Sequence, residues 1–206
     1  MIWRIALAIL IGYLLGNLNG AIMISTHVFH DDVRRHGSGN AGMTNFLRTF
    51  GGRWLLPVIL IDVGKTCLAC LAGWLLLHGS GYGPEGKMLA GLACMVGHAL
   101  PVFYGFHGGK GVLAAGALGL CMHWWTMLIA LAVFFLILGT THYMSLASMV
   151  GVTLWCVMAI CVFWGRWFVV AALAAVAVMV IYLHRGNIQR LIHGTERKTY
   201  LHKPAN

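Results

Sequence analysis

The stretch that decides the fold is residues 54–77, WLLPVILIDVGKTCLACLAGWLLL, in which only Asp62 and Lys65 carry charge. A helix that spans a bilayer needs about 20 consecutive apolar residues, so this run predicts a transmembrane helix. Of all 206 residues, 60% are hydrophobic and only 9% are charged. A soluble domain of this length needs a larger solvated polar surface. The sequence therefore predicts an all-α integral membrane protein.

Four further apolar runs are long enough, or nearly so, to cross the bilayer: residues 2–24, 88–106, 146–165 and 167–184. The run 112–139 is too long for one upright helix, and a polar and aromatic cluster at 123–125 interrupts it. We expect two short helices there, at about 112–122 and 125–139. The prediction is about seven transmembrane helices in one polytopic domain, residues 1–206. The first run is too long for a typical signal peptide and lacks a convincing cleavage site.

The distribution of charge predicts the orientation. The net charge is +9, from 14 Lys+Arg and 5 Asp+Glu. Nucleic-acid binding requires a solvated basic face, which this chain lacks, whereas basic loops of membrane proteins face the cytoplasm and meet anionic headgroups. With the N-terminus outside and the C-terminus inside, the cytoplasmic segments hold ten of the basic residues: Arg34, Arg35, Arg48, Arg53, Lys110, Arg185, Arg190, Arg197, Lys198 and Lys203. The polar segments then share one side of the membrane.

The six cysteines, at positions 67, 70, 94, 121, 156 and 161, all lie in apolar runs. We expect them to be small core residues. The spacing of Cys67 and Cys70 matches a redox or zinc motif, but the pair lies in a predicted membrane helix without a redox fold around it. The sequence therefore predicts no disulfide, no metal and no cofactor.

The segment His107-Gly108-Gly109-Lys110-Gly111 is a candidate phosphate site. Glycines let the backbone adopt positive φ and turn N–H groups toward an anion, and Lys110 adds a positive charge. If Gly111 opens the next helix, the helix N-terminus strengthens the positive field. The segment lacks the spacing of a nucleotide-binding P-loop, and an ordinary flexible turn is the alternative.

Two more polar segments are candidates. Residues 34–48 mix glycines with hydroxyl, amide and arginine side chains, a texture suited to wrapping an anion; a solvated loop is the equal alternative. Residues 184–197 predict a short amphipathic helix that stops at Gly194. His184, Asn187 and Arg190 are spaced three apart there and are able to face one site; a basic cytoplasmic tail is the alternative.

Four further polar residues lie within or beside the predicted spans. Asp62 and Lys65 lie three apart, so they form an ion pair or place Lys65 in a cavity as a second cation for phosphate. His98 among apolar residues is most often a hydrogen-bonded core residue. Ser145 either adds a hydroxyl to the site or caps a helix.

Residues 37–48, 97–112 and 187–196 resemble the three motifs of the bacterial acyl-phosphate:glycerol-3-phosphate acyltransferases, and the resemblance covers nearly the whole chain. It implies a multi-pass inner-membrane enzyme with its active site on the cytoplasmic side. Such an enzyme moves a fatty acyl group from acyl phosphate to the sn-1 hydroxyl of glycerol 3-phosphate, giving lysophosphatidic acid and phosphate, in the first committed step of phospholipid synthesis. The expected partners are these two substrates and membrane lipid, without nucleic acid, and we expect a monomer.

Carried over by position, the resemblance implies three groups of residues. The catalytic candidates are Ser38, Arg48, His184 and Asn187. The substrate-binding candidates are Thr44, Asn45, Gly108, Gly109, Lys110 and Gly111, with Ser145 as a weaker member; Lys65 is added to them from its position in the span, not from the resemblance. Glu196 is expected to hold the structure.

The chain also departs from the common pattern of that family. Proline and alanine are usual where Ala41 and Met43 stand, a glycine usually follows Lys65 where Thr66 stands, and alanine-threonine is usual where Leu113-Ala114 stand. Two usual cations become His107 and His142. At these two positions a histidine, whose charge depends on pH, thus stands in place of a permanent positive charge.

Acyl phosphate has a good leaving group, so direct attack without an acyl-enzyme is the simplest mechanism. Ser38, Asn45 or Asn187 is expected to donate to the developing oxyanion. His184 or an oxygen of the acyl phosphate takes the proton, and we favour the substrate oxygen slightly.

The alternative functions are a transporter or binding protein for a small phosphate-bearing anion, although no inverted repeat is found, and a lipid-binding scaffold, which leaves Ser38, Asn45 and Asn187 unexplained.

Overall fold

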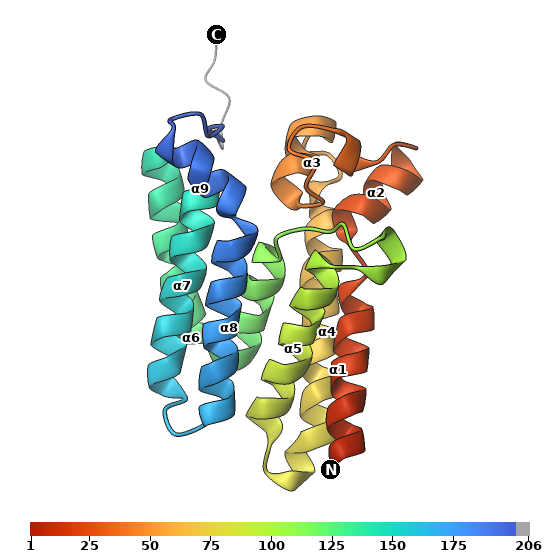
Figure 1. Cartoon of the computed structure of the whole chain (residues 1–206), viewed down its shortest axis with the longest axis vertical. Coiled ribbons are helices and arrows are strands. Elements are labelled where there is room, and N and C mark those ends of the chain that lie inside the picture. The colour runs from red at the N-terminus through yellow and green to blue at the C-terminus, as the bar shows by residue number, and fades with distance from the viewer. Residues whose placement is uncertain (201–206) are drawn as a thin grey trace. The chain divides into compact units, whose positions relative to one another are not determined.

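The computed structural model describes residues 1–200, and all the regular structure in them is helical (Figure 1). The α-helices are α1 (Ile2–Gly16), α2 (Gly20–Val28), α3 (Met43–Phe50), α4 (Leu55–Leu77), α5 (Gly83–Ala99), α6 (Val112–Thr141), α7 (Met144–Val162), α8 (Trp167–Leu183) and α9 (Arg185–Ile192). Three short 3-10 helices, η1 (Val33–Arg35), η2 (His78–Ser80) and η3 (Val102–Tyr104), lie between them. The prediction of an all-α chain is confirmed for these residues.

Within residues 1–200, five helical segments are long and apolar enough to cross a membrane: Ile2–Val28, Leu55–Ser80, Gly83–Tyr104, Val112–Thr141 and Met144–Val162. A sixth is added if α8 and α9, which are bent by 55°, count as one span. If that sixth span is counted, the remaining difference from the predicted seven is the segment Val112–Thr141, which the sequence analysis divided in two.

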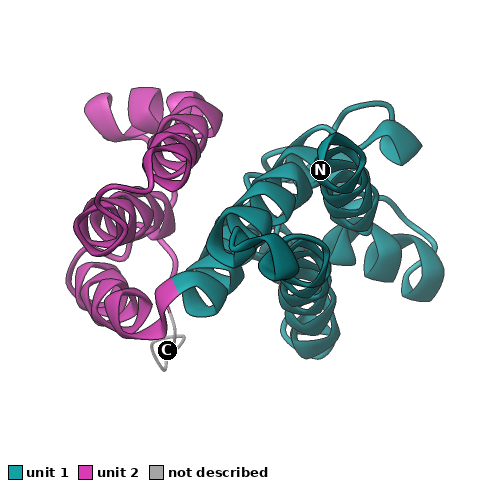
Figure 2. Cartoon of the chain, turned by 90° about the horizontal axis from the view of Figure 1, so that it is seen from below, with its two compact units in different colours: residues 1–122 teal, residues 123–206 magenta. Residues whose placement is uncertain are grey.

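A backbone break interrupts α6 at His123, where φ is −156° and ψ is 95°. The break lies at the polar position between the two short helices predicted from the sequence. It also separates two compact units, residues 1–122 and the residues from His123 onward, shown in teal and magenta in Figure 2. Each unit is described by itself below.

The first unit is built on α1, α4 and α5, which pack side by side (Figures 1 and 2). Glycines let these helices approach closely. A Cβ on Gly16 of α1 would collide with the carbonyl oxygen of Cys94 in α5, and one on Gly73 of α4 would collide with the carbonyl oxygen of Gly86 in α5. Close approach through small residues is a usual way for membrane helices to pack, because lipid offers little hydrophobic drive between them.

The first apolar run does not form the single helix predicted over residues 2–24. The helix α1 ends at Gly16 and α2 begins at Gly20. Two asparagines cause the break: the Asn17 amide nitrogen donates to the carbonyl of Tyr13 at 2.7 Å, and the Asn19 side chain accepts from the N–H of Ile22 at 3.1 Å as the N-cap of α2. Asparagine competes with the helical backbone in this way and therefore favours helix ends.

The third run also has other bounds than the predicted 88–106. The helix α5 begins at Gly83, with Pro84 in its first turn, and ends at Ala99, before Pro101. Proline is suited to a first turn but disfavours helical backbone in the residue before it. Residues after Ala99 therefore form the turn that leads to the glycine-rich segment.

In the second unit, α7 packs against α8, and α9 follows α8 after the bend. The short helix α9 agrees with the amphipathic helix predicted before Gly194, a residue with φ +68°. The chain after Gly194 lies against the turn between α6 and α7. There the N–H of Thr199 donates to the carbonyl of His142 at 2.7 Å, and the Tyr200 ring lies 4.6 Å from the His142 ring.

Candidate active site

Asn45, in the first turn of α3, holds the loop that carries Ser38. The Asn45 side chain is buried. Its amide nitrogen lies within hydrogen-bond distance of three loop carbonyls, those of Val33, His36 and Asn40, at 3.0–3.1 Å, and its two hydrogens are shared among them. Its oxygen accepts from the N–H of Ser38 at 3.1 Å and lies where a Cβ on Gly37 would stand. Asn45 therefore shapes the loop, while Ser38 is exposed.

The candidate cations of this unit are accessible. Arg48 in α3 is exposed and Lys110 is partly exposed; the neutral candidate Thr44 is also partly exposed. The loop before α3 is joined to the glycine-rich segment, because the N–H of Ala41 donates to the carbonyl of Gly108 at 3.3 Å. The proline that is usual at position 41 lacks this N–H. The first two predicted motifs thus lie against each other.

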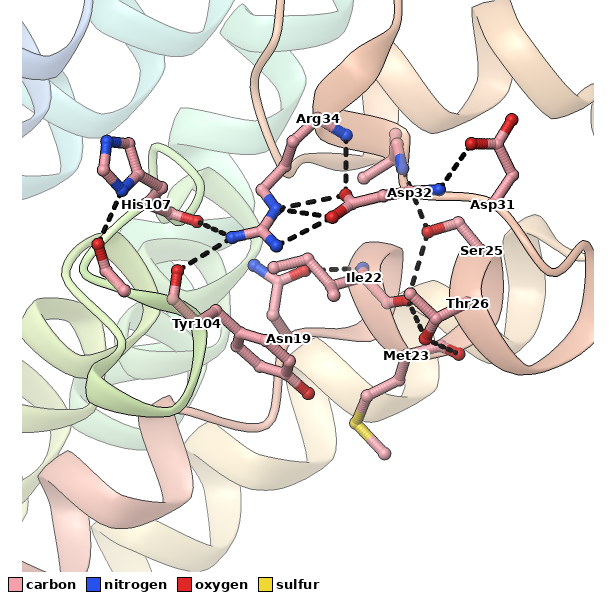
Figure 3. A network of polar contacts seen from close by, with 12 residues as sticks. Asn19, Ile22, Met23, Ser25, Thr26, Asp31, Asp32, Arg34, Tyr104 and His107 are labelled. Atoms are coloured by element: carbon pink, nitrogen blue, oxygen red, sulfur yellow. Dashed lines mark hydrogen bonds and ion pairs between the residues drawn. The ribbon is translucent and has the colours of Figure 1, made fainter.

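Arg34 ties the same two segments together by further contacts, a role that the sequence analysis did not assign. Figure 3 shows its guanidinium between Asp32 and the turn at 104–107. Its Nη1 donates to the carbonyls of Tyr104 at 2.8 Å and His107 at 3.2 Å. Its Nε and Nη2 bind the Asp32 carboxylate, with Nη2 at 2.7 Å from Oδ2. Such a bidentate pair fixes the orientation of the arginine.

The electrostatics of Asp32 follow from this contact. Hydrogen bonds from the Arg34 side chain lower the pKa of Asp32 below its ordinary value of 3.8, although partial burial opposes the shift. The carboxylate therefore stays ionised throughout the neutral range. The pair holds the turn before the glycine-rich segment at any physiological pH.

The glycine-rich segment uses two of its N–H groups internally. The N–H of Gly108 donates to the carbonyl of Ala99 at 3.2 Å, and that of Gly109 donates to the carbonyl of His98 at 3.0 Å. Of the three glycines only Gly111 has positive φ, +72°, and it directly precedes α6, as predicted. The expected reason for the other two was therefore wrong: a Cβ on Gly109 would collide with the His98 imidazole and the carbonyl of Ala41.

Lys65 forms the ion pair that was one of its two predicted alternatives. Its side chain is 1% exposed, and Nζ lies 2.8 Å from Oδ1 of Asp62. The ammonium also donates to the carbonyls of Leu18 at 2.7 Å and Gly16 at 3.2 Å, and lies 2.8 Å from Nδ1 of His98. Protein groups thus surround this cation, and the geometry opposes direct contact with a substrate phosphate.

In the second unit, Glu196 gathers three candidate residues. Its Oε1 accepts from Oγ of Ser145 at 2.7 Å and from Nδ2 of Asn187 at 2.6 Å, while its Oε2 accepts from Nε of Arg190 at 2.7 Å. Burial raises the pKa of Glu196, but these three hydrogen bonds outweigh it, so the pKa lies below its ordinary value. This geometry suits the structural role expected of Glu196.

His184 lies between α8 and α9 and is buried. Its Nδ1 is 2.8 Å from the carbonyl of Val180, which can only accept a hydrogen bond. Nδ1 therefore carries a proton, and in the neutral imidazole Nε2 is the acceptor. If His184 acts as a base, Nε2 is therefore the ring nitrogen that takes the proton.

His107 and His142, the two histidines at positions where the family usually has a cation, differ in their surroundings. His107 is exposed, and its Nδ1 lies 2.6 Å from the carbonyl of Gly105. His142 has φ +61° and lies against Tyr200. Among residues 1–200, no three His, Cys, Asp or Glu side chains are arranged to hold a metal ion.

Comparisons with known proteins agree with the fold and with the family resemblance. The model of the glycerol-3-phosphate acyltransferase family matches residues 6–194. The glycerol-3-phosphate acyltransferase of Bacillus cytotoxicus is 39% identical over 192 residues, 93% of each chain, and that of Finegoldia magna is 36% identical over 186 residues, 90% of this chain and 91% of its own.

A solved structure is similar as well: PlsY (YgiH), an integral membrane glycerol 3-phosphate acyltransferase, in its glycerol 3-phosphate form. It has a TM-score of 0.85 and 29% sequence identity, covering 95% of this chain and 96% of its own. The lysophosphatidic acid form of PlsY gives a TM-score of 0.82. Fold and motifs thus define an integral membrane acyltransferase. The chain belongs to the glycerol-3-phosphate acyltransferase family, which confirms the resemblance seen in the sequence.

Proposed function

We propose that this chain transfers a fatty acyl group from acyl phosphate to the sn-1 hydroxyl of glycerol 3-phosphate, forming lysophosphatidic acid and phosphate. The observation that carries the proposal is the junction of the first two motifs, where Ala41 binds Gly108 and the turn at 104–107 binds Arg34. This junction places the accessible cations Arg48 and Lys110 on two segments that support each other. A phosphate-bearing substrate is the ligand that such cations favour.

Within the first unit, Lys110 and Arg48 bind the phosphate of glycerol 3-phosphate, with Thr44 and the segment 108–111 beside them. Ser38 is the oxyanion donor best suited to the developing charge, because Asn45 spends its amide hydrogens on loop carbonyls. Lys65 supports the fold rather than the substrate. In the second unit, Ser145 and Asn187 are held by Glu196.

The substrate hydroxyl attacks the acyl carbonyl, the bond from this carbon to the phosphate oxygen breaks, and phosphate leaves with its electron pair. The hydroxyl proton passes to an oxygen of the departing phosphate or to Nε2 of His184, whose tautomer permits this. We favour the substrate oxygen, since phosphate is already the leaving group. No acyl-enzyme forms in this mechanism.

The proposal includes the topology. We place the N-terminus outside and the described C-terminal segment in the cytoplasm, with the two parts of α6 on either side of His123 as separate short crossings. The proposed location is the bacterial inner membrane, with a cytoplasmic active site in one monomeric domain. The excess of basic residues in the segments assigned to the cytoplasm supports this orientation.

The test is phosphate release by the purified chain in lipid nanodiscs. Palmitoyl phosphate is supplied with and without glycerol 3-phosphate, and palmitoyl-CoA serves as the comparison donor. We expect release that depends on glycerol 3-phosphate, lysophosphatidic acid in equal amount, and no product from the thioester. Product from palmitoyl-CoA alone, or an acylated Ser38 peptide found by mass spectrometry, contradicts the donor or the direct mechanism, respectively. Uptake of glycerol 3-phosphate into sealed vesicles without product indicates a transporter.

A further inference from the structure

The buried pair Asp62–Lys65 supplies hydrogen-bond partners for the backbone groups at both ends of the break between α1 and α2. At the end of α1 the carbonyls of Gly16 and Leu18 accept from the Lys65 ammonium. At the start of α2 the N–H of Gly20 donates to Oδ1 of Asp62 at 3.2 Å. Backbone groups freed by a helix break at membrane depth need such partners. Because one carboxylate and one ammonium serve the two ends, the break carries no net charge.

His98 of α5 joins this pair. Its side chain is 4% exposed, and Nδ1 lies 2.8 Å from Nζ of Lys65 but 3.5 Å from Oδ1 of Asp62. The shorter distance assigns the hydrogen bond to the ammonium, which can only donate, so Nδ1 is the acceptor. In the neutral ring Nε2 then carries the proton.

The opposite edge of the same imidazole faces the glycine-rich segment. A Cβ on Gly109 would overlap Nε2 of His98, and one on Gly111 would lie 3.9 Å from Cδ2. The backbone adds a second contact, because the N–H of Gly109 donates to the carbonyl of His98 at 3.0 Å. One residue therefore touches the buried ion pair on one edge and the substrate-binding segment on the other.

We propose that His98 is a positioning residue, which fixes the glycine-rich segment on the buried Asp62–Lys65 pair and thereby sets the affinity for glycerol 3-phosphate. The part that concerns affinity rests on the proposed function. His98 itself does not touch the substrate. Its ring fills the space that the absent Cβ of Gly109 leaves, so the distance from Lys65 to the segment is set by a rigid group.

Two substitutions distinguish a positioning role of His98 from a role in which its ring only accepts a hydrogen bond from the Lys65 ammonium. His98→Ala removes both edges of the ring. His98→Asn keeps an oxygen near the place of Nδ1, so the ammonium retains an acceptor, but loses the edge that faces Gly109. We expect His98→Asn to recover most of the thermal stability lost in His98→Ala. His78→Ala is the matched control, because His78 is an exposed histidine at the end of α4.

The first readout is hydrogen–deuterium exchange of peptides that cover residues 105–112, measured in nanodiscs without substrate. We expect faster exchange in both His98 variants and wild-type exchange in His78→Ala. This readout stays valid if the acyl-transfer proposal fails. Wild-type exchange in His98→Asn together with recovered stability overturns the positioning role. A hydrogen-bond acceptor for the Lys65 ammonium would then be sufficient to keep the glycine-rich segment in place.

The second readout is the kinetics of acyl transfer. In His98→Asn we expect the KM for glycerol 3-phosphate to rise about tenfold, with kcat and the KM for palmitoyl phosphate within about threefold of wild type. A KM for glycerol 3-phosphate equal to that of wild type, despite faster exchange, overturns the link to affinity. Equal loss in kcat and in both KM values also contradicts it, since that pattern indicates general damage.

Discussion

Replacing Glu196 tests whether one carboxylate holds the second unit together. The Glu196 side chain is 5% exposed and accepts hydrogen bonds from Ser145, Asn187 and Arg190. A hydrogen bond to a charged group contributes about 1.5–3 kcal/mol, and the arginine bond counts for less because that side chain is 42% exposed. We expect Glu196→Ala to lower the free energy of unfolding by about 3–5 kcal/mol. Glu196→Gln retains one oxygen acceptor and is expected to cost about 1–2 kcal/mol.

The dependence on pH has a definite sign. The pKa of Glu196 is lower in the folded chain than its ordinary value of 4.5. The stabilisation is therefore complete above pH 4.5 and is lost as the pH falls through the folded-state pKa. Glu196→Gln has no carboxyl to protonate at this position, so its difference from wild type is expected to shrink in that acidic range.

Thermal unfolding in nanodiscs, at neutral pH and along an acid series, measures both effects. A loss of 3–5 kcal/mol corresponds to a fall of about 6–20 °C in Tm for a chain of this length. Asp31→Ala is the control, because Asp31 also pairs with a basic side chain, His36, but is solvent-exposed. Equal Tm values for Glu196→Ala and Asp31→Ala would refute the reasoning, since the three hydrogen bonds would then contribute nothing measurable.

Three further predictions concern the first unit. Gly109→Ala is expected to reduce acyl transfer more than tenfold, because its Cβ would collide with two neighbouring groups, whereas Gly79→Ala, which has open space, leaves the rate unchanged; initial rates at saturating donor measure this. Asp32→Asn is expected to raise the KM for glycerol 3-phosphate about threefold at neutral pH, since it weakens the arginine clamp on the turn. Lys110→Ala is expected to raise the same KM at least tenfold, and the exposed Arg53→Ala to change it less than about twofold; initial rates over a range of glycerol 3-phosphate concentrations measure the KM of all three variants.

The accuracy with which the sequence predicted the bounds of each helix differed between helices for a physical reason. The run 54–77 gave α4, Leu55–Leu77, almost without error, because apolar length alone determines where a spanning helix lies. The break at residues 17–19 was missed, since two amides leave a long apolar run apolar on average. Its stability depends on Asp62 and Lys65, which are more than 40 residues away. Contacts of that kind have no local signal.

The candidate site shows the same limit. The polar texture of residues 34–48 left anion binding and a solvated loop as equal alternatives, and it did not tell which donors serve the loop itself. Asn45 and the N–H groups of Gly108 and Gly109 turned out to be occupied by backbone carbonyls. Only the contacts distinguish a donor that builds the loop from one that is available to a ligand.

The broken helix and the buried ion pair are two costly features, and each removes the cost of the other. Unpaired backbone groups at the break and unpaired charges on α4 would both be unfavourable at membrane depth. Together they form a neutral, hydrogen-bonded cluster of Gly16, Gly20, Asp62 and Lys65. The cluster holds α1, α2 and α4 in one arrangement, and His98 extends that arrangement to the glycine-rich segment. An asparagine-rich break in one apolar run and an acid and a lysine three apart in the next are therefore best interpreted as partners.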